Sequence, residues 1–119
     1  MGVFDTTQAN WGRAANVNGT CKAWANFKGT GTVALSSAFN VSTVTDNGTG
    51  EYTVNFTTNM DDALYCVVTG GQESNTNTTT VTLGVDADTI AVGSVKIRAT
   101  SSSVGAADFV ANHVAIFAN

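Results

Sequence analysis

The sequence predicts an all-β protein, a single antiparallel β-sandwich with a jelly-roll-like or an immunoglobulin-like strand order. Three observations favour this fold. The chain has 119 residues, which is a single-domain length. Only 12% of the residues are charged, and Thr, Asn, Gly, Val and Ala are abundant, as in strands joined by tight polar turns. From Thr20 onward, short β-prone runs alternate with Gly, Asn and Asp at the spacing of sandwiches and barrels.

An N-terminal arm is expected over residues 1–19, ahead of a sandwich domain over residues 20–119. The arm shows no strand alternation, and it carries two large aromatic residues, Phe4 and Trp11. Two interpretations stay open. The arm is a disordered leader, because termini are poorly ordered unless they are tied down, or it is a short extended segment whose aromatic side chains dock on a neighbouring subunit.

Eight strands are predicted from the alternation of apolar and polar residues. The clearest covers residues 51–58, where Tyr52, Val54 and Phe56 point to one face, the predicted core face. Trp24 falls in the strand pattern as well and is expected in the core. The expected strands cover residues 21–28, 32–36, 39–45, 51–58, 64–70, 79–85, 94–100 and 108–117.

A hairpin is expected between strands 39–45 and 51–58. Phe39 and Val41 form an apolar stripe on the first of these strands. Residues 46–50, which are Asp, Asn, Gly, Thr and Gly, supply the types that tolerate positive φ in a tight turn.

The last predicted strand, residues 108–117, is apolar on both faces. Such a strand is either central to the core or covered by another chain. We therefore expect a homo-oligomer, because identical subunits can provide that cover by symmetry. A helix over residues 106–117 is the alternative, given the alanine content. The interface candidates are Phe4, Trp11, Phe109 and Phe117.

No catalytic, cofactor-binding or metal-binding residues are expected. His113 is the only histidine, and no nucleophile signature accompanies it. The pairs Asp61–Asp62 and Asp86–Asp88 lack the spacing of a calcium loop and are expected to cap turns. A glycan-cleaving enzyme is disfavoured, because no acid/base pair of carboxylates stands out. With five basic and nine acidic residues and a net charge of -4, nucleic-acid binding is not expected.

The remaining signals concern the cysteines, the membrane and one polar tract. Cys21 and Cys66 are expected as free buried thiols, with a disulfide as the alternative. No apolar run approaches the ~18 residues of a membrane span, and the start of the chain lacks a secretory pattern. Residues 74–80 are expected to form a polar loop, with a host glycan contact as the alternative.

Three segments stand out beyond these patterns: KAWxNFxGTGT over Lys22–Thr32, FNVSxxTDNGTGxYTVNFTT over Phe39–Thr58, and NHVAIFAN over Asn112–Asn119. In this order they resemble a small β-rich module of marine and cyanobacterial bacteriophage tail-fibre-like and other virion structural proteins. The resemblance covers roughly Lys22–Asn119. It implies a structural module and brings no catalytic or binding residues with it. Family members often carry a proline near Thr58–Asp61, whereas this chain has none.

The resemblance implies a virion protein made in the host cytoplasm, with no enzymatic activity. The expected function is that of a tail-fibre or tail-tip component that contributes to particle assembly and host-surface attachment. The alternative is a capsid decoration (cement) protein that grips the major capsid subunits through its N-terminal arm. The expected partners are further copies of this chain, other virion proteins of the tail or capsid, and a host-surface glycan. Neither nucleic acid nor membrane insertion is expected.

Overall fold

The computed structural model describes residues 19–74, 81–86, 89–102 and 104–119. All regular secondary structure within these ranges is β-strand, so the all-β prediction is confirmed. The helix considered for residues 106–117 is wrong, because a strand occupies most of that segment. The predicted arm, apart from Gly19, and most of the Thr-Asn tract lie outside the described residues.

Each of the eight expected strands has a counterpart, and a short strand, β8, was not expected. The boundaries differ by up to three residues. The strands are β1 (Thr20–Lys28), β2 (Ala34–Phe39), β3 (Val41–Gly48), β4 (Glu51–Phe56), β5 (Cys66–Gln72), β6 (Val81–Val85), β7 (Ser94–Ser101), β8 (Gly105–Ala106) and β9 (Ala111–Ala118).

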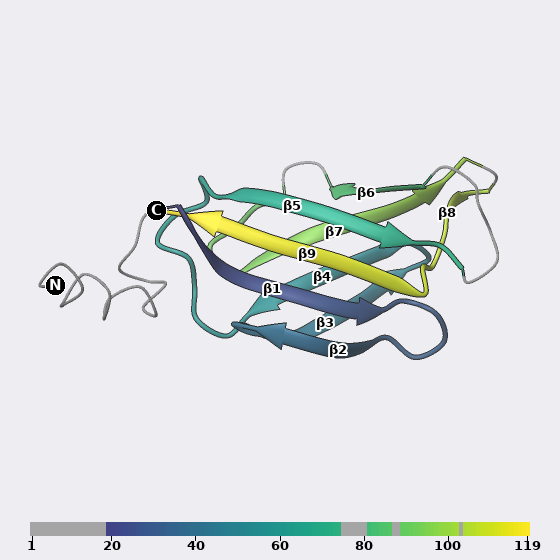
Figure 1. The fold of residues 1–119 in the computed structure, drawn as a ribbon, viewed down its shortest axis with the longest axis horizontal. Coiled ribbons are helices and arrows are strands. Elements are labelled where there is room, and N and C mark those ends of the chain that lie inside the picture. Colours follow the sequence, from purple (N-terminus) through teal and green to yellow (C-terminus); the bar gives the residue numbers. More distant parts are fainter. Residues whose placement is uncertain (1–18, 75–80, 87–88, 103) are drawn as a thin grey trace, which may run out of the picture.

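The strands form two sheets that pack face to face as a sandwich (Figure 1). The first sheet, called here the β9 sheet, has the order β2-β1-β9-β5. The second, the β4 sheet, has the order β3-β4-β7-β6, and β8 pairs with β7. All pairs are antiparallel. The first strand thus lies between the second and the last, which is not the immunoglobulin order.

The core lies between the inward faces of the two sheets. β4 contributes Tyr52, Val54 and Phe56, as predicted, and all three are buried. Two edge-to-face aromatic pairs tie the sheets and loops together. Phe27 and Tyr52 have ring centroids 5.2 Å apart, and Phe56 and Tyr65 have centroids 5.9 Å apart. Such pairs contribute about 0.5–1.5 kcal/mol each beyond the area they bury.

The chain changes sheets between β2 and β3, at Asn40. This residue has φ 54, a left-handed conformation that asparagine tolerates better than most side chains. Because of the turn, Phe39 stays on the outside of the β9 sheet, 44% exposed, while Val41 enters the core. The expected shared stripe of Phe39 and Val41 is therefore wrong for Phe39.

The hairpin between the third and fourth strands is confirmed, since β3 and β4 pair from Val41 opposite Phe56 to Gly48 opposite Glu51. Gly48 and Gly50 both have positive φ in its turn. Asp46 Oδ1 accepts a 3.1 Å hydrogen bond from the Gly48 amide, which closes the turn locally.

The structure corrects the predicted positions of two aromatic residues, Phe109 and Trp24. Phe109 precedes β9 and is completely buried, and its carbonyl accepts a 2.9 Å hydrogen bond from the Gly29 amide. Phe109 is therefore a core residue, and the interface role predicted for it is wrong. Trp24, expected in the core, is 39% exposed on the outside of the β9 sheet.

Candidate functional site

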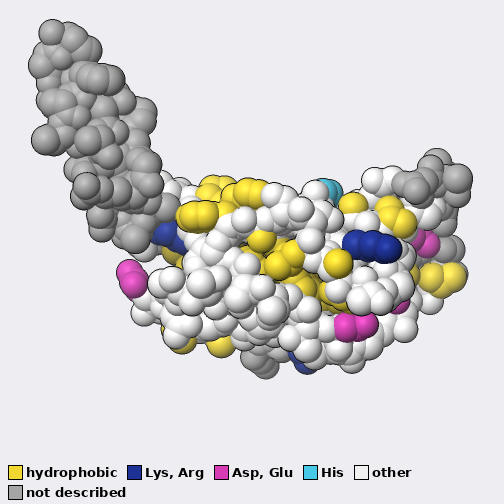
Figure 2. Space-filling view, turned by 90° about the horizontal axis from the view of Figure 1, so that it is seen from below, with side chains coloured by type: hydrophobic (Ala, Val, Ile, Leu, Met, Phe, Trp, Pro, Cys, Tyr) yellow, Lys and Arg dark blue, Asp and Glu magenta, His cyan; other side chains and the backbone are white. Residues whose placement is uncertain are grey.

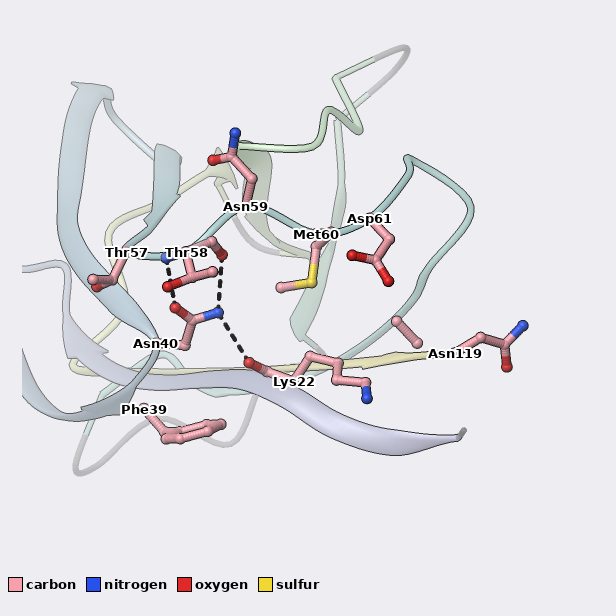
Figure 3. Close-up of a pocket in the computed structure, with 10 residues that line it drawn as sticks. Lys22, Phe39, Asn40, Thr57, Thr58, Asn59, Met60, Asp61 and Asn119 are labelled. Carbon is pink, nitrogen blue, oxygen red and sulfur yellow. Dashed lines mark hydrogen bonds between the residues drawn. The ribbon is translucent and has the colours of Figure 1, made fainter. Parts of the chain in front are cut away.

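A pocket of about 400 Å³ opens at one end of the sandwich, where β1, the β2–β3 corner and the loop after β4 meet (Figure 3). We call it the corner pocket. Residues from the segments Lys22–Thr32, Phe39–Thr58 and Asn112–Asn119 all contribute to it, together with the loop that follows β4. Its lining residues are Lys22, Phe39, Asn40, Thr57, Thr58, Asn59, Met60, Asp61, Ala118 and Asn119.

The side chain of Asn40 fixes one wall of the corner pocket. Its Nδ2 group donates hydrogen bonds of 3.1 Å to the carbonyl oxygens of both Lys22 and Thr58. Its Oδ1 atom accepts a 2.7 Å hydrogen bond from the Thr58 amide. These bonds are the dashed lines of Figure 3. Since both amide hydrogens and the oxygen are used, Asn40 joins β1 to the end of β4 as a structural clamp.

The chemistry of the corner pocket is amphipathic. Met60 is buried at 7% exposure, and its amide donates a 2.8 Å hydrogen bond to the Val92 carbonyl. In Figure 3 the thioether of Met60 points into the pocket, while the Asp61 carboxylate and the Lys22 ammonium lie toward one rim. Neither histidine nor cysteine is among the lining residues. The pocket suits an apolar group with a polar margin, and it lacks an activated nucleophile with its base.

A second candidate site is the outer face of the β9 sheet, defined by the outward side chains of β1, β2, β5 and β9. The strand register aligns one residue from each strand in a single row, Phe39–Trp24–Ala115–Val68. We call it the Trp24 row. Phe39, Trp24 and Val68 are 44%, 39% and 51% exposed. Figure 2 shows hydrophobic side chains along the upper rim, where this face is seen edge-on.

A second row lies two residues along the strands. Phe117 of β9 is 38% exposed and pairs with Cys21 on one side and Cys66 on the other. Strands are spaced ~4.8 Å apart, so the two cysteine Cα atoms lie roughly 10 Å apart, beyond the ~7 Å limit for a disulfide. Both thiols are free. The expectation of buried thiols is wrong for Cys66, which is exposed.

Between Trp24 and Val68 the outer face is hollowed by a shallow depression of about 500 Å³. Its middle lies over β9, where Ala115 is small, and it extends over Gly70 of β5, which has no side chain. His113 is exposed beside it. The face thus combines a partly exposed indole with an adjacent hollow.

The outer face is almost uncharged. Its outward positions on the four strands carry one formal charge, that of Lys28 at the end of β1. The protein as a whole has fourteen charged side chains, five basic and nine acidic. Among the residues that the structure describes, the acidic side chains lie elsewhere, and this face is set apart by its neutrality.

The fold separates the two predicted interface residues that the structure describes, Phe109 and Phe117. Phe117 is on the outer face, Phe109 is in the core, and Phe4 and Trp11 lie outside the described residues. His113 lies on the outer face and is not combined with a cysteine in its own row.

The acidic pairs that the sequence offered as metal ligands do not form a metal site in the described residues. Asp62 caps a turn as predicted, because its Oδ1 atom accepts a 2.8 Å hydrogen bond from the Leu64 amide. Asp88 lies outside the described residues. Within the described ranges, no three His, Cys, Asp or Glu side chains gather as a metal site would require. Those ranges also contain no helix with the length and apolar character of a membrane span.

Trp24 is the residue that sequence reasoning missed, although a signal for it was present. Ala23, Ala25 and Phe27 alternate with Trp24 and Lys28. Because side chains alternate between faces along a strand, the charged Lys28 places Trp24 on the solvent side.

Comparison with known proteins adds no assignment: no family model, curated protein or solved structure matches this chain.

Proposed function

We propose that this chain is a non-enzymatic structural protein of a bacteriophage particle, a tail-fibre or tail-tip component that contributes to assembly and host-surface attachment. The proposal begins from the three segments that resemble virion modules. One observation carries it: the first and second of these segments, far apart in the sequence, join through Asn40, which bonds Lys22 of the first as well as Thr58 of its own segment. The residues behind the resemblance are therefore the frame of the fold.

A second link of the same kind supports a structural role. Asn112, from the third segment, is completely buried and donates a 3.1 Å hydrogen bond to the carbonyl of Phe27 in the first segment. β1 and β9 also pair from Thr20 opposite Ala118 to Phe27 opposite Asn112. Contacts of this kind fix the positions of the strands relative to one another, which suits a structural component of a particle.

The proposed partners are further copies of this chain, other virion proteins and a host-surface glycan. The corner pocket is the place proposed for the glycan contact. Its lining combines the ring of Phe39 with the hydroxyl and amide groups of Thr57, Asn59 and Asn119, which Figure 3 shows spread around the pocket. Binding sites of this type combine an apolar surface with a few polar groups that fix orientation.

Particle composition tests the proposal. Purified particles are digested, and the copy number of this protein is measured by quantitative mass spectrometry against the major capsid protein. A few to a few dozen copies per particle are expected for a tail component. Hundreds of copies would replace the tail assignment by the capsid decoration alternative. Absence from purified particles would overturn both.

A further inference from the structure

We infer that the outer face of the β9 sheet is a contact surface between two copies of this chain, related by a two-fold axis that runs along β9. The inference takes its biological setting from the proposed function, where it identifies the surface through which copies associate. The contact itself is a property of the isolated protein and is tested in solution.

The starting point is that large apolar side chains on this face are contiguous. Phe39 pairs with Trp24, and Trp24 lies one strand from Ala115, which in turn pairs with Val68. Phe117 extends the surface along β9. Leu64 at 89% and Val104 at 67% lie in loops, and Val85 at 38% lies at the end of β6 in the other sheet. Isolated apolar residues on a surface are ordinary, whereas a contiguous set marks an interaction site.

The neutrality of the face identifies the partner. A strongly charged partner would bury its charges against side chains that cannot pair with them, which is costly. An identical face brings no such charges, apart from Lys28 at the end of β1. The acidic side chains of the described strands and loops then stay outside the contact. A second copy is therefore the partner whose chemistry matches.

The shape of the face is complementary to itself. The Trp24 row places the indole on the β1 side of β9 and Val68 at the same level on the β5 side. A two-fold axis along β9 therefore sets Trp24 of each copy opposite Val68 and the neighbouring hollow at Gly70 of the other. One patch provides both a large exposed side chain and a space that can receive it, as a two-fold contact requires.

The area of the face limits the strength of the contact. Four strands spaced ~4.8 Å apart, with about eight residues rising ~3.3 Å each, span roughly 19 by 26 Å. That is roughly 500 Å² in projection, whereas standard interfaces bury about 800 Å² per partner. The expected dimer is therefore weak and reversible, and nearly the whole face must take part in the contact. Removing one large side chain should impair it strongly.

The first test is sedimentation equilibrium of the full chain across micromolar to millimolar concentration. A reversible dimer is expected. W24S and V68K, which alter the Trp24 row, should each raise the dimer dissociation constant at least ~10-fold, as loss of a central aromatic anchor does. L64S and V104S are the matched controls, because they remove apolar groups that are more exposed but lie off the face. Circular dichroism confirms that each variant is folded.

The outcomes of this test are distinct. A protein that stays monomeric at millimolar concentration overturns the inference. So does a dimer that survives both W24S and V68K, or one that L64S and V104S weaken equally. A trimer or larger ring overturns the two-fold arrangement.

The second test uses the cysteines as position markers. Cys21 and Cys66 flank Phe117 in one row, so an axis along β9 sets Cys21 of one copy opposite Cys66 of the other. Packed sheets lie ~10 Å apart, and a bis-maleimide of about that span should join the two thiols. C21S and C66S should each fail to cross-link alone, whereas a mixture of the two should give cross-linked dimer. Cross-linking of either variant by itself would contradict the axis.

These tests separate the inference from the proposed function. A solution dimer without incorporation into particles would leave the contact standing and remove the virion role. Incorporation of a strictly monomeric protein would do the reverse.

Discussion

Tyr52 donates a 2.6 Å hydrogen bond to Oδ1 of Asp108, a residue 56 positions further along the chain. The same carboxylate oxygen accepts a 2.9 Å hydrogen bond from the Gly50 amide. The ring of Tyr52 is completely buried against Phe27. A single buried side chain thus joins the core of the sandwich to the hairpin turn and to the segment that leads into β9.

Tyr52→Phe is expected to destabilise the fold by about 2 kcal/mol, because hydrogen bonds to charged groups contribute ~1.5–3 kcal/mol. Tyr65→Phe is the matched control. Its hydroxyl donates to the neutral carbonyls of Ala91 and Ser94, at 2.8 and 3.2 Å, and its loss should cost only about 1 kcal/mol. Urea unfolding measures both, and an equal or reversed order would contradict the assigned role of Asp108.

Stability is expected to fall as the pH rises above about 10. Burial, the hydrogen bond from Tyr52 to Asp108 and the negative charges of Asp108 and Asp46 raise the pKa of Tyr52 well above its ordinary value. Burial also raises the pKa of Tyr65. The unfolded chain releases these protons near pH 10 while the folded chain retains them, so above that pH unfolding is favoured increasingly.

Absorbance at 295 nm checks this pH dependence. Tyrosinate should appear only as circular dichroism shows the protein unfolding, and Tyr52→Phe should reduce the slope of stability against pH above 10. A folded protein whose tyrosines titrate with a midpoint near 10 would contradict the prediction.

Asn40 has two roles, since its side chain makes hydrogen bonds and its backbone is left-handed. The variants Asn40→Gly and Asn40→Ala separate these roles. Both remove the amide that bonds Lys22 and Thr58, which should cost about 2 kcal/mol in total at this partly exposed corner. Asn40→Ala should cost a further ~1–2 kcal/mol, because alanine is strained at φ 54 and glycine is not. Thermal unfolding measures the pair. Equal stability of the two variants would show that the backbone at this corner relaxes.

Gly50→Ala should destabilise the fold far more than Gly31→Ala. Both glycines have positive φ, +70 and +64, so alanine costs roughly 1–2 kcal/mol at either position. At Gly50 the added Cβ would also lie 2.5 Å from the Ala99 carbonyl oxygen and 2.9 Å from the Ala107 amide nitrogen, whereas Gly31 faces open space. Denaturant midpoints of the two variants give the comparison, and similar midpoints would mean that the turn at Gly50 shifts away from Ala99 and Ala107.

The strands were predictable because their alternation is local. The alternation of Tyr52, Val54 and Phe56 with polar residues predicts β4 from six consecutive residues. The residue types of the β3–β4 turn predict the hairpin. Burial between two sheets then follows from the same pattern, since one apolar face needs cover.

The positions of single aromatic residues were not predictable in the same way. Phe39 depends on the change of sheet at Asn40, which is fixed by bonds to Lys22 and Thr58 on other strands. Phe109 depends on where β9 begins, and its ring fills the space beside Gly71 of β5. The corner pocket likewise requires three distant segments to meet. Such features follow from tertiary contacts, which periodicity along the chain does not contain.

The pairing of β1 with β9 has a mechanical consequence. Thr20 lies opposite Ala118, and the Gly19 amide donates a 2.9 Å hydrogen bond to the Ala118 carbonyl. The chain therefore enters and leaves the sandwich at the same end. Tension applied between residues 19 and 119 would peel the two strands apart one rung at a time. A pull applied through only one of these ends would instead load the sheet as a unit, because the pairing of β1 with β9 would not be opened from its last rung.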